Sequence, residues 1–195
     1  MPRRYTLGKR AEQQAATRAR IVVAALALIR DGGLRAAGIP AVAVAADVAP
    51  ATVRNHFPGP GDLADAVAVA VVAEIQPPGV EMFTGLASVT ERVERLAREL
   101  AAFFERSGSW WDVQQADPDL AAAWAGRSAQ FSAYLADLAA AAVAPLGDDR
   151  AAAVVTSMVA GPPLYFALRE QGLSSDEAVA VGLGVVLPWL EGRGG

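Results

Sequence analysis

The chain has 195 residues, 53% of them hydrophobic, and a formal net charge of −4, enough for one large domain or two small ones around a substantial core. It contains no cysteine, which excludes a disulfide framework and a thiolate site. No apolar run of roughly 18 residues lacks a charge or a helix breaker, and the start MPRRYTLGKR lacks the apolar stretch of a signal peptide, so we expect a cytoplasmic protein with no membrane span.

The charge is unevenly spread along the chain. Residues 1–35 hold eight basic and two acidic side chains, a net +6, which leaves −10 for the remainder. A basic head on an acidic body favours a surface that faces nucleic acid. The alternative is a disordered basic tail that only aids solubility. We prefer the first reading because the basic segment directly precedes the motif described below.

The first predicted helix follows this basic segment. Residues 1–16 are polar and basic, and are either disordered or a helical lead-in. We take Thr17 as the N-cap of the helix, whose apolar stripe at helical spacing includes Ile21, Ala25 and Leu28. Asp31-Gly32-Gly33 ends it.

Two short helices joined by a tight turn are predicted in residues 38–57, GIPAVAVAADVAPATVRNHF. Pro40 lies in the first turn of one helix and Pro50 opens the other. Asp47 stands at the reversal, where a left-handed backbone is needed and Asp tolerates it. The residues predicted to face inward are Val42, Ala46, Val48, Val53 and Phe57. Those left facing solvent are Thr52, Arg54, Asn55 and His56, and such a donor-rich helix, braced by an apolar one, is suited to reading the major groove.

The rest of the chain has helical periodicity and no strand-like alternation. A helix is expected to start within Gly59-Pro60-Gly61-Asp62 and to end near Ile75. The later helices are predicted from Ser88 to Ser107, from Asp117 to about Ala144, from Asp148 to about Gln171, and from Ser174 or Ser175 to about Leu190, with a short segment from Trp110 to Ala116. Glu91–Arg95 and Glu94–Arg98 are predicted ion pairs on an exposed face. Gly161-Pro162-Pro163 and the Gly184 and Pro188 pair are predicted to kink the last two helices.

Residues from Thr17 to about Ile75 resemble the TetR family of bacterial transcriptional regulators. The positions that match the family motif in order are Val42-Ala43, Ala46, Val48, Thr52-Val53, His56-Phe57 and Pro58. The departures are Gly38 for a capping Thr, Asp47 for the turn Gly, Ala49 for a Ser, Arg54 for a Tyr, and Pro60 for the Lys that opens the fourth helix and holds a phosphate. They affect the usual phosphate contacts more than the fold.

The resemblance implies an all-α fold of about nine helices, with an N-terminal three-helix helix-turn-helix head that binds DNA and a C-terminal helical body for ligand binding and dimerisation. We predict a basic arm at 1–16, a DNA-binding domain at 17–76 with its motif at 38–57, and the body at 77–195. The predicted DNA-binding residues are Pro50, Ala51, Thr52, Arg54, Asn55, His56, Arg18, Lys9 and Arg10.

No catalytic chemistry is predicted. His56 is the only histidine, and neither a cluster with metal-ligand spacing nor a phosphate-cradling glycine motif occurs. The paired acids Asp117/Asp119 and Asp148/Asp149 stand at helix starts, where capping explains them better than catalysis. We therefore expect no enzyme, no catalytic or metal-binding residue and no cofactor. His56 is either a structural histidine or, as the family places it, a phosphate contact, and we prefer the second.

The body holds an aromatic set that is either plain core or the lining of a ligand cavity, which the resemblance implies. The predicted pocket residues are Phe103, Phe104, Trp110, Trp111, Trp124, Arg127, Phe131, Tyr134, Met158 and Tyr165, with Gln114, Gln130 and Thr156 as further polar candidates. Few charges lie among them. Because an uncompensated buried charge is costly, we expect a small apolar or aromatic effector of drug size.

These observations predict a sequence-specific, DNA-binding transcriptional regulator, a ligand-responsive repressor that binds a palindromic operator in double-stranded DNA as a homodimer, with no membrane partner. The predicted dimer interface on the last two helices consists of Val154, Val155, Val159, Val181, Val185, Val186 and Trp189. The alternative is a small-molecule binding module whose head no longer binds DNA, and Asp47, Arg54 and Pro60 motivate it.

Overall fold

The computed structural model describes residues 3–59 and 61–192, with side chains from residue 8 onward in those ranges. Every regular element within them is helical, so the all-α prediction is confirmed. Pro60, which is predicted to lie at the start of the fourth helix, is outside the described residues. The contacts divide the chain into two compact units. Unit 1 comprises Met1–Glu74 and Ser109–Ala125, and unit 2 comprises Ile75–Gly108 and Gly126–Gly195.

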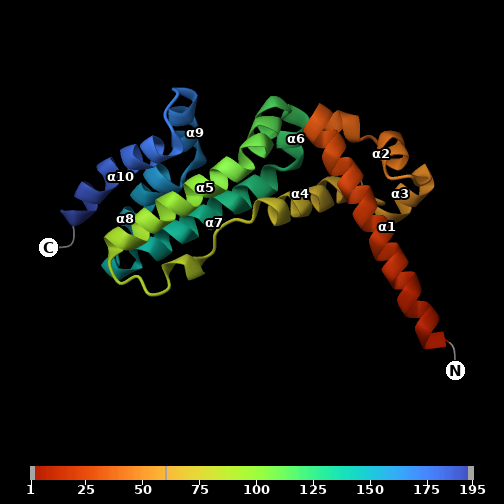
Figure 1. Cartoon of the computed structure of the whole chain (residues 1–195), viewed down its shortest axis with the longest axis horizontal. Coiled ribbons are helices and arrows are strands. Elements are labelled where there is room, and N and C mark those ends of the chain that lie inside the picture. The colour runs from red at the N-terminus through yellow and green to blue at the C-terminus, as the bar shows by residue number, and fades with distance from the viewer. Residues whose placement is uncertain (1–2, 60, 193–195) are drawn as a thin grey trace. The chain divides into compact units, whose positions relative to one another are not determined.

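Unit 1 is built on one long helix, α1 (Arg3–Gly32), against which two short helices pack (Figure 1). The 3₁₀ turn η1 (Leu34–Ala37) leads into α2 (Ile39–Ala45), α3 (Pro50–His56) and α4 (Asp62–Ile75). The Thr17 cap is wrong, because α1 continues back to Arg3 through Ala, Gln, Glu and Arg residues that favour helix. The helices predicted within residues 38–57 are confirmed to within one residue.

The last part of α5 (Val89–Ala116) and all of α6 (Pro118–Ala123) also belong to unit 1. The predicted boundary placed them in the body, beyond residue 76. Their sequence neighbours are body helices, whereas their contacts are with the head. The core of unit 1 is formed by fully buried apolar side chains of α1 to α4 and α6: Ile21, Ala25, Ile29, Val42, Val53, Val67 and Leu120.

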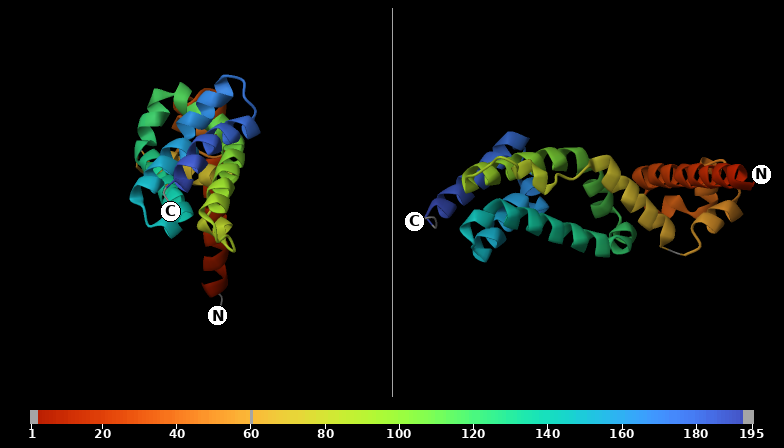
Figure 2. Two further views of the ribbon diagram at one scale, coloured as in Figure 1. Left: turned by 90° about the vertical axis from the view of Figure 1, so that its left-hand side faces the viewer. Right: turned by 90° about the horizontal axis from the view of Figure 1, so that it is seen from below.

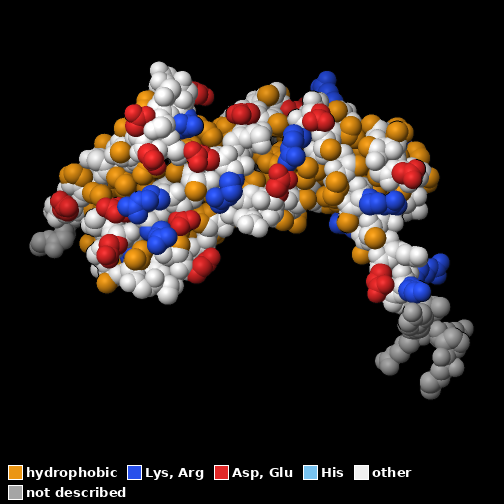
Figure 3. Space-filling view, in the orientation of Figure 1, with side chains coloured by type: hydrophobic (Ala, Val, Ile, Leu, Met, Phe, Trp, Pro, Cys, Tyr) orange, Lys and Arg blue, Asp and Glu red, His pale blue; other side chains and the backbone are white. Residues whose placement is uncertain are grey.

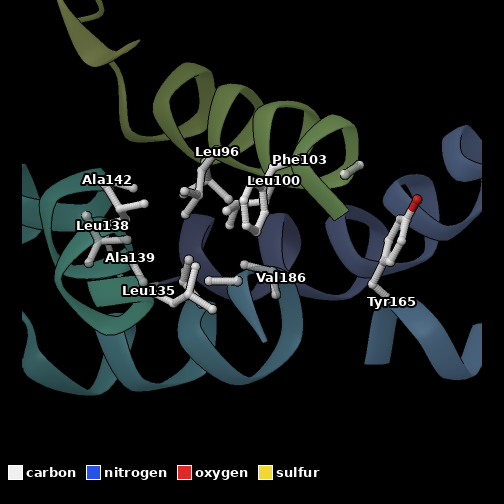
Figure 4. Close-up of a cluster of buried hydrophobic side chains, with 14 of the residues drawn as sticks. Leu96, Leu100, Phe103, Leu135, Leu138, Ala139, Ala142, Tyr165 and Val186 are labelled. Carbon is white, nitrogen blue, oxygen red and sulfur yellow. The ribbon is translucent and has the colours of Figure 1, made fainter. Parts of the chain in front are cut away.

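Unit 2 is a helical bundle around one apolar core. It contains η2 (Val80–Phe83), most of α5, α7 (Ala125–Val143), η3 (Ala144–Leu146), α8 (Asp149–Val155), the π-helical segment η4 (Thr156–Ala160), α9 (Pro162–Glu170) and α10 (Ser175–Glu191). Figure 4 shows α5 and α7 facing each other through this core, with Val186 of α10 and Tyr165 of α9 beside them. The core residues that α5 and α7 contribute include Leu96, Leu100, Phe103, Leu135, Leu138, Ala139 and Ala142.

Two predicted helix boundaries in the body are wrong. Helix α5 runs through Gly108 without a break to Ala116, so the separate segment from Trp110 does not exist. The helix predicted from Asp117 to Ala144 is divided at Trp124 into α6 and α7. A single helical glycine costs only about 1 kcal/mol, and packing outweighs that cost in α5.

At Gly161-Pro162-Pro163, where a kink is predicted, the helix is interrupted completely. The chain passes from α8 into η4, and α9 begins at Pro162, where a missing N–H is tolerated. Helix α10, in contrast, continues past Pro188 as far as Glu191.

The ion pairs on α5 differ in part from those predicted. Arg98 and Glu94 approach to 2.7 Å, as predicted, but Arg95 pairs with Glu99 at 3.2 Å. Glu91 is used elsewhere: its carboxylate accepts from the Ser88 hydroxyl at 2.8 Å, while the Glu91 N–H donates to the Ser88 oxygen at 3.1 Å. This capping box at the start of α5 is the stronger local demand on Glu91.

By length and composition alone, three described segments are apolar enough to cross a membrane: Asp62–Phe83, Ala125–Leu146 and Asp149–Glu170. The first contains the end of α4 at Ile75, and the third contains the break before Pro162. Their hydropathy reflects a high content of Ala and Val. The absence of a membrane partner stays a prediction.

Candidate nucleic-acid interface

The turn between α2 and α3 has the geometry expected of a helix-turn-helix. Asp47 has a φ of 52°, which confirms the left-handed backbone predicted for it. The Asp47 N–H donates to the Val44 carbonyl at 3.2 Å, and the Val48 N–H donates to the Ala43 carbonyl at 3.0 Å. These two bonds close the carboxyl end of α2 and direct the chain into α3.

Helix α3 is held against α2 by its apolar side. Val42, Val53 and Phe57 are buried, with exposed fractions of 0%, 1% and 4%. Ala46 is buried beside them and Val48 is half-buried. The inward-facing set predicted from the sequence is therefore the core of the motif.

The opposite side of α3 faces solvent. Pro50, Ala51, Arg54 and Asn55 are exposed, whereas Thr52 and His56 are half-buried. Arg54 and Asn55 thus offer a cationic fork and an amide, the groups that pair with phosphates and base edges. The His56 ring lies 6.4 Å from that of Phe57, at the end of the helix.

Helix α1 brings a second set of cations to this unit. The guanidinium carbon of Arg18 lies 4.6 Å from the centroid of the Phe57 ring, a cation–π contact that fixes Arg18 beside the end of α3. Lys9 and Arg10 are exposed, nearer the amino end of α1. Among the predicted DNA-binding residues on α1, Arg18 is therefore in direct contact with the motif.

The amino end of α4 carries acid instead of base. The Asp62 carboxylate accepts from the Gly59 N–H at 2.8 Å, and Asp65 lies in the same first turn. A helix amino end ordinarily attracts anions, but two carboxylates there repel a phosphate. The amino end of α4 is therefore not a favourable phosphate site, whereas α1 and α3 carry exposed cations.

One carboxylate joins α6 to η1, the turn that leads into the motif. One oxygen of Asp117 accepts from the Leu34 N–H at 2.6 Å, and the other accepts from the N–H groups of Asp119 and Leu120 at 2.9 and 3.1 Å. Asp117 thus caps both η1 and α6. The bonds from the backbone N–H groups of Leu34 and Leu120 hold the pKa of Asp117 below its usual range. Gly33 is required here, because its φ is 74° and a Cβ would overlap the Asp117 carboxylate.

Two tryptophans brace the same junction. The Trp124 Nε1–H donates to the Ala64 carbonyl of α4 at 3.2 Å, and the rings of Trp110 and Trp124 lie 6.2 Å apart. Arg30 stacks over Trp110 at 4.7 Å and pairs with Glu74 at 2.7 Å. Trp110 and Trp124, predicted as pocket residues, are thus packed among α1, α4 and α6 of unit 1. Because Trp110 and Trp124 are far from α1 and α4 in the sequence, no local pattern predicts these contacts.

Trp111 and Gln114 also belong to unit 1, and the other pocket candidates lie in unit 2. Phe103, Phe104 and Tyr165 are buried in its core, and the rings of Phe104 and Tyr165 lie 5.2 Å apart. Tyr134 donates its hydroxyl to the Pro78 carbonyl, and burial raises its pKa. Phe104, Met158 and Tyr165 line a cavity of about 20 Å³. That volume is room for one water and far below the ~300–1,000 Å³ of a drug-sized site.

The predicted dimer residues fall into two groups. Val181 and Val185 are 42% and 53% exposed, and Val154, Val159 and Trp189 are half-buried. Val155 and Val186 are fully buried in the core of unit 2, so a second chain cannot reach them. An open apolar groove between α8 and α10 is lined by Ala153, Val154, Ser157, Met158, Val185 and Trp189.

Comparison with known families agrees with this geometry. Residues 21–67 match the model of a family described as bacterial regulatory proteins, tetR family. The matched stretch runs from the buried part of α1 through α2 and α3 into α4. No curated protein matches the chain.

Proposed function

Because the chain belongs to the TetR family of transcriptional regulators through its DNA-binding domain, we propose that it is a repressor that binds a palindromic operator as a homodimer. A small apolar or aromatic effector bound by unit 2 would release the repressor from the operator. The observation that carries this proposal is α3: a short helix braced on α2, with Arg54 and Asn55 exposed on its outer side.

Dimerisation follows from the requirements of such an operator. Two recognition helices can enter successive major grooves only if they are about 34–36 Å apart. A two-fold contact through α8 and α10 would fix that spacing, and the exposed Val181 and Val185 with the groove beside Trp189 support it. An isologous contact of this kind covers the same apolar face on both chains.

The effector would enter unit 2 beside Phe104, Met158 and Tyr165. The cavity there is small, so binding must widen it. The break between η4 and α9 supports this site, because Gly161 and Pro162 interrupt the helical hydrogen bonding next to it. A ligand acts only through its different affinity for the two conformations. The conformation with the widened cavity would be the one that does not bind DNA.

The first experiment measures DNA binding by fluorescence anisotropy, using duplexes from the DNA that flanks the protein's own gene. We expect one duplex to bind at least about a thousand-fold more tightly than a shuffled duplex, as specific regulators do. Equal binding to both, or none, would contradict the proposal and favour the small-molecule binding module.

The second experiment tests the effector site. Ala178 lines the cavity and is 5% exposed, so Ala178→Leu should fill it. We expect this variant to keep its operator affinity and to lose release by apolar aromatic compounds. Ala180→Leu, on the exposed side of the same helix, is the matched control and should respond normally. Release that survives Ala178→Leu would place the effector elsewhere.

A further inference from the structure

Helix α1 begins well before the part of it that packs. The family match starts at Ile21, but the helix starts at Arg3. Every side chain from Gly8 to Arg20 is exposed except Thr17, which is half-buried. Figure 1 shows this part of α1 extending past α2 and α3, and the left view of Figure 2 shows the same helical turns from the side. In Figure 3 this part carries basic side chains and little apolar surface. From residue 8 to residue 20 it spans about 18 Å.

A helix with no buried side gains nothing from packing. Isolated helices of this length are marginal in water, so a partner that this segment binds would stabilise it. Its side chains include Lys9, Arg10, Arg18 and Arg20 against Glu12 alone. That excess of positive charge disfavours a second copy of the same helix and favours a polyanion.

The basic residues are arranged in register with the motif. Arg10, Gln14 and Arg18 are four residues apart, and the same side of the helix continues through Ile21 and Ala25, which are fully buried against the motif. The stacking of Arg18 on Phe57 shows that this side still faces the end of α3 one turn before Ile21. Arg10 and Gln14 therefore extend the side of α1 from which α3 projects.

Arg20 belongs to the opposite side. It follows Arg18 by two residues, and residues two apart do not share a helix face. Lys9, Gln13 and Ala16 lie on the Arg20 side at intervals of three or four residues. The two sides carry similar charge, so they provide an internal comparison within one helix.

We propose that Arg10, Gln14 and Arg18 form a phosphate-binding stripe on α1, which contacts the backbone of double-stranded DNA beyond the base pairs reached by α3. The inference rests on the proposed DNA binding. The stripe supplies charge that the amino end of α4 lacks, since Asp62 and Asp65 occupy that end. Arginine and glutamine donors are among the common partners of phosphate oxygens.

The test compares Arg10→Ala with Arg20→Ala on the operator duplex over a range of salt. Losing one phosphate contact lowers the slope of log K against log salt by about 0.9 and weakens binding about five-fold at 0.15 M salt. Because the proposed homodimer carries the stripe twice, we expect Arg10→Ala to lower the slope by about 1.8 and to weaken binding about thirty-fold at that salt, while Arg20→Ala stays within two-fold of the wild type. Gln14→Glu should weaken binding further than Arg10→Ala because it places a carboxylate against phosphate.

Duplex length gives a second measurement. Trimming about five base pairs from each end, the reach of an 18 Å helix, should weaken the wild type and Arg20→Ala but leave Arg10→Ala unchanged. If the wild type binds and Arg10→Ala matches Arg20→Ala on both duplexes, the stripe is wrong while the proposed function stands. If the wild type binds no duplex, the proposed function itself is wrong. Sedimentation of the free protein excludes a change in self-association as the cause.

Discussion

Two neighbouring residues of α3 have different chemistry at the same exposure. Arg54 carries a full charge and suits phosphate, whereas Asn55 offers the donor and acceptor that pair with a base edge. We expect Arg54→Ala to weaken binding to all sequences and to flatten the salt slope by about one unit for each of the two chains of the dimer. Asn55→Ala should instead relax base preference at one position. Anisotropy titrations on operator and single-base variants measure both, and an unchanged slope for Arg54→Ala would remove it from the contact set.

Asp47 controls the turn through its backbone. At a φ of 52° a Cβ is disfavoured, and Asp is tolerated because its short side chain can bond locally. Asp47→Ala should therefore lower stability by about 1 kcal/mol, whereas Asp47→Gly should leave the folded unit at least as stable. Thermal unfolding followed by circular dichroism separates the two. Equal losses for both variants would mean that the carboxylate, and not the φ angle, is what matters.

At the scale of elements, the junction of η1, α6 and the motif depends on Asp117. Replacing it with Ala removes the acceptor of three backbone N–H groups, and we expect a loss of about 2 kcal/mol, comparable with the larger N-cap deletions. Trp110 and Trp124 lie in the same unit, so tryptophan fluorescence during urea unfolding reports on it. Asp148→Ala, an N-cap in unit 2, is the matched control and should leave the unit 1 transition in place.

The same carboxylate predicts a pH dependence. Its folded pKa is lowered, first by the Leu34 bond, so its contribution is complete above the unfolded pKa of about 3.9. That contribution is lost as pH falls through the lower folded pKa. We expect the stability difference between wild type and Asp117→Asn to shrink as pH is lowered from 5 to about 3. A constant difference would show that the carboxylate is not bonded in solution.

Elements were predictable where their signals are local. Pro40, Asp47 and Pro50 fix the ends of α2 and α3 through their own backbone preferences. The helix-turn-helix motif was therefore predictable from the sequence. The Leu34–Asp117 hydrogen bond joins residues that are 83 positions apart in the sequence, so no local sequence pattern predicts it. The continuity of α5 through Gly108 and the break at Trp124 likewise depend on tertiary packing, which outweighs propensities of about 1 kcal/mol.

At the scale of the whole molecule, local sequence patterns are again insufficient to predict long-range contacts. The sequence predicted a head, a body and a set of aromatic residues, but it could not assign each aromatic residue to a unit. Trp110 and Trp124 read as body residues because body helices flank them, whereas their contacts are with α1 and α4. Trp124→Ala is therefore expected to disturb DNA binding directly, through Ala64, and is not a clean probe of the effector.

The dimer provides the prediction that involves the whole molecule. Val185 is 53% exposed and lines the groove beside Trp189. In a two-fold contact each substitution occurs twice, near the axis, so Val185→Asp would bury two like charges without partners. We expect the wild type to sediment at about twice 20.2 kDa and Val185→Asp as a monomer with weakened operator binding. Val80→Asp, at 59% exposure on η2, carries the same charge change and should remain dimeric. A Val185→Asp chain that stays dimeric would move the interface away from α8 and α10.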